Sequence, residues 1–191
     1  MFLDQYLQGV FGLTKKESED VRFLFEKRKI KKGGHIQTEG QVNRDLLILE
    51  TGIIREYYLK DGKEVTKWIS KSNSIIVDLS SFLSQGFSRF SLQALEDSEL
   101  YCISFSSYLQ LKEYIPDWSK IETQLITKCF TIVEQRLMQF LTLSAEQRYL
   151  EFFEQYKELF NEVPQQLIAS MLGMSPETLS RFRAKHTISF S

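Results

Sequence analysis

The sequence predicts an α+β protein with an N-terminal antiparallel β-roll or jelly-roll barrel flanked by helices, one long dimerisation helix, and a C-terminal helix-turn-helix domain. Three observations predict this fold. Residues 28–105 hold short β-branched or alternating runs separated by Gly, Asn and Asp, which is typical of closed or double-sheet antiparallel folds. Residues 118–143 have a helical period, and residues 165–184 have the spacing of two short helices around a glycine turn. We therefore expect domains over 1–117, 118–143 and 144–191.

Length and composition fit a globular chain. The 191 residues include 42% hydrophobic ones, which is enough for a packed core. The formal net charge is −1, so any attraction for phosphate is expected to be local and sensitive to salt. The N-terminus has no basic start ahead of an apolar run, and no segment reaches the roughly 18 apolar residues of a membrane span. We expect a cytoplasmic protein that does not contact membranes.

No metal centre, cofactor or catalytic chemistry is predicted. Cys102 and Cys129 stand apart from each other and from histidine, so we expect buried small apolar residues rather than zinc or iron–sulfur ligands. His35 and His186 are far apart in the sequence and are expected to be solvated rather than haem ligands. The chain has no glycine-rich phosphate loop and no Ser/His or Cys/His pair at catalytic spacing, so an enzyme is not expected.

The first 27 residues are predicted to form two helices. Thr14 and Glu17 make a capping box ahead of an apolar run, so a helix is expected over Lys15–Lys27. Within the strand-rich segment, Asp61-Gly62 separates two β-prone runs. This dipeptide predicts a tight hairpin.

After residue 105 the helical period returns, with a short helix expected over Ser106–Tyr114 and a long one over Trp118–Leu143. The long helix carries two apolar stripes. One has coiled-coil spacing and is the predicted dimer interface: Ile126, Phe130, Val133, Leu137 and Phe140. The other is expected to pack on the barrel: Trp118, Ile121, Leu125, Cys129 and Ile132. The alternative is that neighbouring helices of the same chain cover both stripes.

The C-terminal segment begins at a domain boundary expected between Leu143 and Ser144. Ser144 and Gln147 form a second capping box, which predicts a helix through Phe160 that supports the helix pair behind it. The pair itself has apolar residues at helical spacing, a small residue where two helices can cross, and a glycine at the turn. These residues are Ile168, Ala169, Leu172, Gly173, Met174, Leu179 and Phe182.

The second helix of the pair is predicted to read DNA. Ser175 is expected as its N-cap and Pro176 as its first residue. Its outer face fits a major groove, with Arg181 reading guanine and Glu177 accepting from cytosine. The predicted DNA contacts are Gln165, Gln166, Ser175, Pro176, Glu177, Thr178, Ser180, Arg181, Arg183 and Lys185, of which the two glutamines would position the protein on phosphate. The alternative is an ordinary helical hairpin with a solvated outer face.

The order of barrel, long helix and helix-turn-helix resembles the Crp/Fnr family of bacterial transcription regulators over nearly the whole chain. Lys32–Gly40 (KGGHIQTEG) looks like an early barrel turn of that family, and Leu46–Arg55 (LLILETGIIR) looks like its following strand-Gly-strand. Ser175–Arg181 (SPETLSR) is similar to its recognition helix, in which a Glu and an Arg four residues apart read the bases. The resemblance therefore assigns base reading to Glu177 and Arg181.

One segment departs from the family. Cyclic-nucleotide members carry Gly-Glu-x-x-Leu, then Arg-Ser/Thr-Ala some ten residues later, whereas this chain has Val77-Asp78-Leu79 and then Ser88-Arg89-Phe90. Cyclic AMP is therefore expected to bind poorly or not at all. Asp78, Ser88 and Arg89 are the candidate effector-binding residues, with Arg89 either touching a ligand anion or serving as a surface or salt-bridged arginine. The cysteine cluster used for oxygen sensing in other members is absent.

These features predict a homodimeric DNA-binding transcription regulator that does not respond to cyclic AMP and whose operator is an inverted repeat of double-stranded DNA. A small-molecule effector of unknown identity could act on the barrel, and RNA polymerase is left open as a further partner. The alternative is a small-molecule or protein-binding sensor module whose helix-turn-helix does not bind DNA. No role is assigned to residues 186–191.

Overall fold

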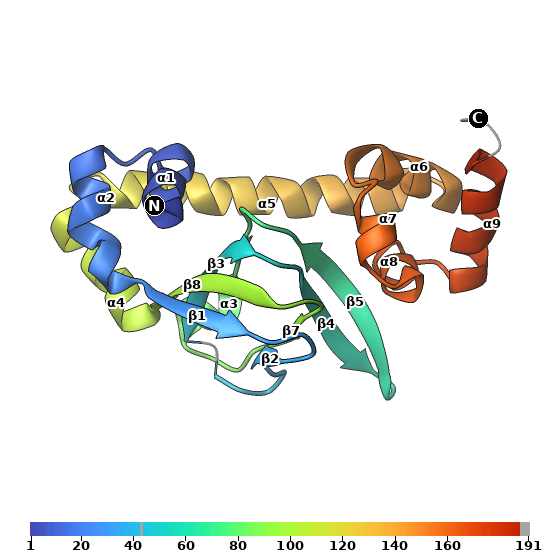
Figure 1. Ribbon diagram of the computed structural model, residues 1–191, viewed down its shortest axis with the longest axis horizontal. Helices are drawn as coiled ribbons and strands as arrows, with labels where there is room; N and C mark the ends of the chain where they lie inside the picture. Colours follow the sequence, from blue (N-terminus) through green and yellow to red (C-terminus); the bar gives the residue numbers. More distant parts are fainter. Residues whose placement is uncertain (43, 188–191) are drawn as a thin grey trace.

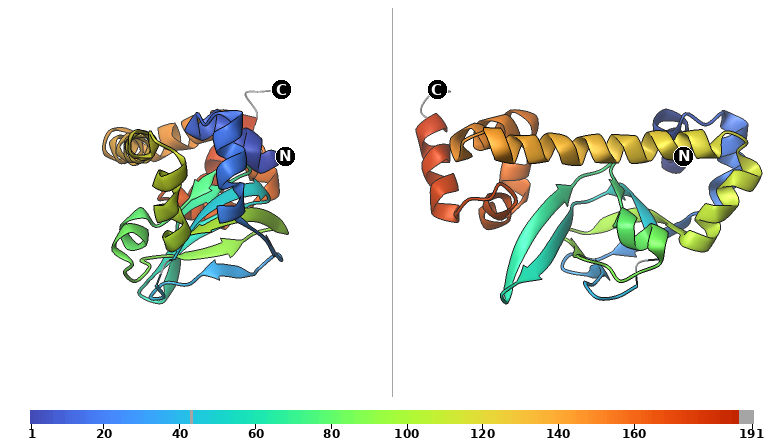
Figure 2. Two further views of the ribbon diagram at one scale, coloured as in Figure 1. Left: turned by 90° about the vertical axis from the view of Figure 1, so that its left-hand side faces the viewer. Right: turned by 180° about the vertical axis from the view of Figure 1, so that it is seen from behind.

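A computed structural model of the chain describes residues 1–42 and 44–187 (Figure 1). A β-roll lies under the middle of one long helix, with N-terminal helices at one end of that helix and the C-terminal helices at the other. Figure 2 shows the same arrangement from the side and from behind, with the N-terminal helices and the last helix, α9 (Pro176–Thr187), near opposite ends of the long helix. The predicted α+β architecture is confirmed.

Two four-stranded antiparallel sheets make the β-roll. The first has the order β1-β8-β3-β6 and the second β2-β7-β4-β5. The strands are β1 (Glu26–Ile30), β2 (His35–Gln37), β3 (Asp45–Thr51), β4 (Ile54–Lys60), β5 (Lys63–Ser70), β6 (Ile75–Ile76), β7 (Ser91–Ala94) and β8 (Ser98–Ser104). One buried apolar cluster of the β-roll draws residues from both sheets: Leu47, Leu49, Ile54, Ile76, Leu92, Ala94, Leu100 and Cys102. Burial of this surface supplies the main stabilisation of the barrel.

The predicted hairpin at Asp61-Gly62 is confirmed between β4 and β5. Both turn residues have positive φ, 52° at Asp61 and 74° at Gly62, as a two-residue hairpin turn of the favoured hand requires. Further along the hairpin the register slips, because Tyr57 pairs with Thr66 whereas Glu56 pairs with Trp68. Lys67 is therefore the extra residue of a β-bulge, a feature that bends a strand and redirects its side chains.

The N-terminal helices and the start of the long helix share a second core with the outer face of the first sheet. The helices are α1 (Phe2–Phe11), α2 (Lys15–Val21), the 3-10 turn η1 (Arg22–Leu24), α3 (Leu79–Ser84), α4 (Phe105–Tyr114) and α5 (Trp118–Thr142). Trp118 is 3% exposed and packs against Phe11 and Tyr108, while Ile121 and Leu125 lie partly buried on the same core. The first half of the stripe that was predicted to pack on the barrel therefore lies in this shared core. Farther along the same stripe, Ile132 is exposed.

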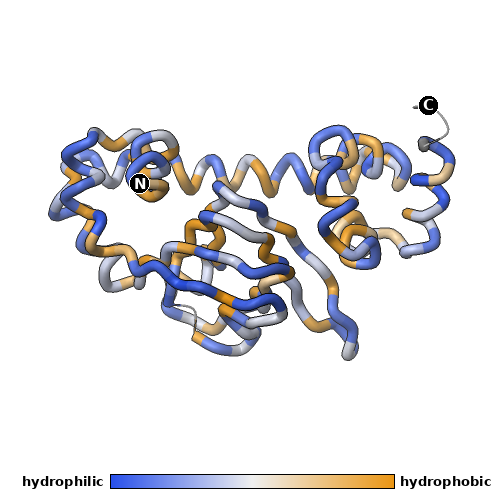
Figure 3. The backbone as a smooth tube through the Cα atoms, in the orientation of Figure 1, coloured by the Kyte–Doolittle hydropathy of each residue, from blue (hydrophilic) through white to orange (hydrophobic). Residues whose placement is uncertain are grey.

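The predicted dimer seam lies along the other side of α5 and is uncovered in the single chain. Phe130 is 66% exposed and Val133 61%, and Leu137 and Phe140 are also exposed, whereas Ile126 is half-buried. In the described part of the chain no neighbouring helix covers Phe130, Val133 or Leu137, so the alternative of internal coverage does not hold for this middle part of the seam. Figure 3 shows hydrophobic turns recurring along α5 among hydrophilic ones.

Two helix boundaries differ from the prediction. The helix expected over Lys15–Lys27 ends at Val21, because β1 begins at Glu26 and pairs with β8 from the Glu26–Cys102 pair onward. Its capping box at Thr14 is present.

No helix in the described residues is long and apolar enough to cross a membrane.

The helix expected through Phe160 breaks at Tyr156, giving α6 (Ala145–Gln155) and α7 (Leu159–Glu162). In a continuous helix Tyr149 and Phe160 would stand about 16 Å apart along the axis. The break brings the ring centroids of Tyr149 and Phe160 to 5.8 Å from each other. Burial of this aromatic cluster favours the broken helix over the continuous one that the local sequence period predicts.

Candidate nucleic-acid interface and effector site

The helix-turn-helix consists of α8 (Gln165–Met171) and α9 (Pro176–Thr187), packed on α6 and α7. Ile168, Ala169 and Leu179 are fully buried in its core, and Phe182 lies partly buried against Tyr149 of α6. Met171 is a further buried residue that the spacing argument did not include. The core therefore fixes the inner side of α9 along its length.

The turn between the two helices depends on Gly173. Its φ is +66°, and a Cβ built there would lie 2.8 Å from Cε1 of Phe140 on α5. The ring of Phe140 is itself held between the guanidinium groups of Arg136 and Arg148, at 5.5 and 4.8 Å from its centroid. Phe140, predicted only as an interface residue, thus also packs against the turn of the helix-turn-helix.

We expect Gly173→Ala to lower the free energy of unfolding by about 2–3 kcal/mol, because a left-handed non-glycine residue costs roughly 1–2 kcal/mol and the added methyl displaces the Phe140 ring. Gly12→Ala is the matched control, since Gly12 has φ +71° with no atom within 4 Å of its built Cβ. Thermal unfolding of both variants measures the difference. Equal losses in the two variants would show that the contact with Phe140 contributes nothing.

The outer side of α9 carries the predicted DNA-contacting groups at the surface. Glu177, Ser180, Arg181 and Lys185 are exposed, and Thr178 and Arg183 are half-buried. Ser175 caps the helix, accepting from the Thr178 N–H at 3.2 Å. Pro176 is its first residue. At the start of α8, Gln166 is exposed and Gln165 half-buried. The structure thus brings the predicted groups to one end of the molecule.

Several of these groups have partners within the chain, Glu177 and Lys185 among them. A hydrogen bond with the Ser175 side chain, with a further one from its own backbone N–H, holds the pKa of Glu177 below its usual range. Lys185 bonds Glu146 of α6 at 2.8 Å, and Nε2 of His186 lies 2.7 Å from the same carboxylate. The prediction of a solvated His186 is therefore wrong, because its side chain contacts Glu146 and is only 19% exposed. Of the tail 186–191, residues 188–191 lie outside the described residues. His35, the other histidine, begins β2 and lies 2.9 Å from the Tyr57 hydroxyl.

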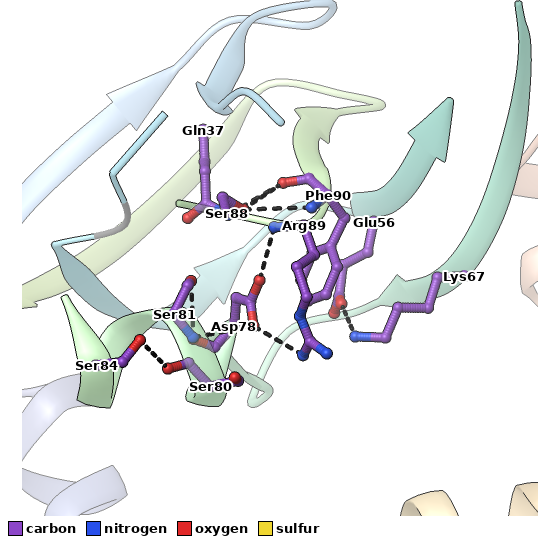
Figure 4. Close-up of polar contacts among 10 residues, drawn as sticks. All are labelled: Gln37, Glu56, Lys67, Asp78, Ser80, Ser81, Ser84, Ser88, Arg89 and Phe90. Carbon is purple, nitrogen blue, oxygen red and sulfur yellow. Dashed lines mark hydrogen bonds and ion pairs between the residues drawn. The ribbon is translucent and has the colours of Figure 1, made fainter. Parts of the chain in front are cut away.

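The three candidate effector-binding residues lie together beside α3, as Figure 4 shows. Asp78 is 1% exposed and caps α3. Its carboxylate accepts from the backbone N–H of Arg89 at 3.0 Å and from the Arg89 guanidinium at 3.1 Å. Burial alone would raise the pKa of Asp78, but these hydrogen bonds outweigh it and the pKa lies below its usual range.

Ser88 and Arg89 point in different directions, as neighbours in an extended segment do. Ser88 is 3% exposed, and its hydroxyl donates to the Phe90 carbonyl at 2.7 Å and accepts from the Gln37 amide. The Arg89 side chain is 67% exposed and holds Asp78. Arg89 is thus salt-bridged to Asp78, and its contact with a ligand anion stays a prediction.

Three residues of this site were missed from the sequence. Glu56 and Lys67 form an ion pair of 2.9 Å, and the Lys67 ammonium lies 3.8 Å from the centroid of the Phe90 ring. Phe90 is 5% exposed. The β-bulge at Lys67 cannot be predicted from an alternating sequence pattern. Phe90, however, could have been singled out from the sequence, because the cyclic-nucleotide members of the family have Ala at the corresponding position.

The described residues contain no group of three or more His, Cys, Asp or Glu that could hold a metal ion. Cys102 is buried, as expected, and Cys129 is half-buried on α5. Burial raises the pKa of the Cys102 thiol to about 12.

Residues 27–114 match the family model of the cyclic nucleotide-binding domain. No curated protein matches the chain in sequence. Among solved structures, a CooA mutant from Carboxydothermus hydrogenoformans superposes with a TM-score of 0.73 at 16% identity, covering 99% of this chain and 85% of that one. The global regulator CLP of Xanthomonas campestris, described as responsive to c-di-GMP, gives 0.70 at 18% identity over 92% of this chain and 93% of its own.

The catabolite activator protein of Thermus thermophilus gives a TM-score of 0.59 at 22% identity, covering 93% of this chain and 85% of that one. At these identities the likeness establishes the fold. Residues 27–114 are a cyclic nucleotide-binding domain, and the whole described chain has the Crp-type arrangement of β-roll, long helix and helix-turn-helix.

Proposed function

We propose that this chain, with its cyclic nucleotide-binding domain and Crp-type fold, is a homodimeric DNA-binding transcription regulator that does not respond to cyclic AMP. The observation that carries the proposal is the asymmetry of α9. Its inner side is buried through Leu179 and Phe182, whereas the side bearing Glu177 and Arg181 faces solvent at the end of the molecule. A recognition helix needs one side packed firmly on the rest of the domain and another side accessible to DNA.

The exposed seam of α5 supports the homodimer. A single chain that leaves Phe130, Val133 and Leu137 more than half exposed carries an apolar stripe of coiled-coil spacing, which a second copy can cover. Pairing two α5 helices places two α9 helices in one molecule. An inverted-repeat operator with half-sites about 34 Å apart would match that symmetry.

The polar groups on α9 support sequence-specific rather than general DNA binding. Arg181 can donate two hydrogen bonds to guanine, and Glu177 can accept from cytosine. Elsewhere in the chain many cations are already paired: Lys27 with Glu50 and Glu99, and Lys31 with Asp97. Several cations of the basic run at β1 are thereby paired with acidic neighbours.

Two of the compared proteins are described as a catabolite activator protein and a global regulator, which fits the proposal. A small-molecule effector of the barrel and contact with RNA polymerase stay predictions from the sequence and are not part of this proposal. An alternative sensor module without DNA binding would lack a steep dependence of DNA affinity on salt.

We expect Arg181→Ala to weaken binding to a selected operator by about 1–3 kcal/mol, roughly 5- to 150-fold, and to relax base preference at one position of each half-site. Fluorescence anisotropy with labelled duplexes measures the affinity. Lys120→Ala is the control, because it removes one exposed cation at the far end of α5 and tests the effect of net charge alone. Operator binding unchanged by Arg181→Ala would refute the assignment of base reading.

A further inference from the structure

Phe90 occupies an enclosed place among charged groups of the candidate effector site. Its ring is 5% exposed. Lys67 lies over the ring at 3.8 Å from the centroid, and the Arg89 guanidinium carbon at 5.9 Å. Figure 4 shows the ring beside Arg89, with the Glu56–Lys67 pair alongside. A cation over an aromatic face is an attractive contact, and it is stronger where water is excluded.

The polar groups around the ring are satisfied by one another. Asp78 accepts from both the main chain and the side chain of Arg89, Ser88 is bonded to Gln37 and to the Phe90 carbonyl, and Lys67 pairs with Glu56. A ligand entering here would have to separate buried Asp78 from Arg89 and displace the ring. Separating a buried charge from its partner is strongly unfavourable.

Lys67 also stands next to the contacts that hold the helix-turn-helix on the barrel. The neighbouring Thr66 donates its backbone N–H to the hydroxyl of Ser170 on α8 at 2.9 Å, and because β5 is an edge strand, α8 covers part of that edge. On the other side of the bulge, the Trp68 ring lies 4.8 Å from the guanidinium of Arg136, which donates to the Met171 carbonyl at the end of α8.

We propose that Phe90 is a built-in occupant of the effector site, which holds the bulged part of β5 through Lys67 and so keeps the helix-turn-helix docked on the barrel without a bound small molecule. The bulge is the mechanical link, since Thr66, Lys67 and Trp68 are consecutive and contact α8, the Phe90 ring and α5 respectively. The consequence for DNA rests on the proposed function; the docking itself does not.

The direct test is the hydrogen-exchange rate of the Thr66 amide, measured by NMR in the full chain. Ser170→Ala removes the hydroxyl that accepts from the Thr66 N–H. Its exchange rate is the reference for a Thr66 amide that is not bonded to α8. We expect Phe90→Ala to speed exchange of this amide about tenfold more than Leu92→Ala does. Leu92 is the matched control because it is also a buried apolar residue of the same barrel, between the sheets and outside the Lys67 contact. Equal effects of the two variants would overturn the proposal.

Chemical rescue separates the ring from general loss of stability. Phe90→Ala leaves a space the size of a phenyl group under the Lys67 ammonium, and benzene bound there would restore the contact between the cation and an aromatic face. Benzene is expected to return the Thr66 exchange rate of Phe90→Ala towards that of the parent chain. If benzene leaves the rate unchanged, the ring is not the element that holds the hairpin.

A second variant keeps the test independent of cavity effects. Lys67→Gln changes a half-exposed side chain, leaves Phe90 in place, and is expected to speed Thr66 exchange several-fold. An unaltered rate in this variant would contradict the proposed link.

The last test is whether the parent chain binds cyclic nucleotides. Titration calorimetry with cyclic AMP, cyclic GMP and cyclic di-GMP is expected to give no heat of binding and no change in Thr66 exchange; saturable binding of any of them would overturn the proposal. In parallel, operator affinity should fall in Phe90→Ala and recover with benzene. A parent chain that binds no operator at all refutes the proposed function, while the exchange results still decide the role of Phe90.

Discussion

Leu137→Glu is expected to convert the proposed dimer into a folded monomer that binds operator DNA at least a hundredfold more weakly. Full burial of a leucine contributes about 1.5–3 kcal/mol. A symmetric interface loses two leucines, so the dimer is weakened by roughly 3–6 kcal/mol, or two to four powers of ten in its dissociation constant. Two glutamates brought together in the seam add repulsion.

The adjacent residue provides the control for that experiment. Met138 is 51% exposed and Leu137 57%, but one residue along an α-helix lies about 100° further around it, which takes Met138 off the seam. Met138→Glu should therefore leave the dimer intact. Sedimentation velocity of the two variants measures the oligomeric state. A Leu137→Glu protein that remains dimeric would place the interface elsewhere.

Tyr149→Ala is expected to remove about 3–5 kcal/mol from the stability of the C-terminal helices, the cost of truncating a large buried aromatic residue. Tyr149 is 1% exposed and its ring contacts Phe153, Phe160, Phe182 and His186. Because Phe182 belongs to α9, loss of the Tyr149 ring should loosen α9, the proposed recognition helix, and abolish operator binding, while the barrel stays folded.

Tyr156 is the matched control, since it belongs to the same aromatic group but is 39% exposed. Tyr156→Ala should cost less than about 1 kcal/mol, because little of its surface is transferred from water. Denaturant unfolding followed by far-ultraviolet circular dichroism measures both variants, and Trp118 fluorescence reports on the core that the N-terminal helices share with the first sheet. Equal losses for the two tyrosines would contradict the central place of Tyr149.

Local signals in the sequence located most elements because they act over a few residues. Thr14 with Glu17 and Ser144 with Gln147 form the predicted capping boxes, and Asp61-Gly62 makes the predicted turn. Each depends on backbone preferences and hydrogen bonds of neighbouring residues. The fold followed from the order of such elements.

Long-range packing explains what the sequence did not predict. The break at Tyr156 depends on the approach of Phe160 to Tyr149, and the end of α2 depends on pairing of β1 with β8. The bulge that makes Lys67 neighbour Phe90 is a property of strand register. None of these contacts follows from helical or alternating periodicity, because the partners are distant in the sequence.

Site prediction was limited in the same way. The spacing of Glu177 and Arg181 places both on the outer side of α9 without knowledge of the barrel. By contrast, the pairing of Arg89 with Asp78 and the second role of Phe140 at Gly173 need three-dimensional contacts. Helix-face assignments were accessible from sequence, whereas partners across the fold were not.

Selection of bound duplexes from a pool of random-sequence DNA decides whether this chain is a dimeric reader of DNA. A dimer with two outward-facing α9 helices should enrich an inverted repeat whose half-sites are centred about one helical turn, roughly 34 Å, apart. Arg181→Ala should lose the preference at one position of each half-site. Recovery of an unenriched pool, or of one asymmetric half-site, would contradict a dimeric reader of DNA.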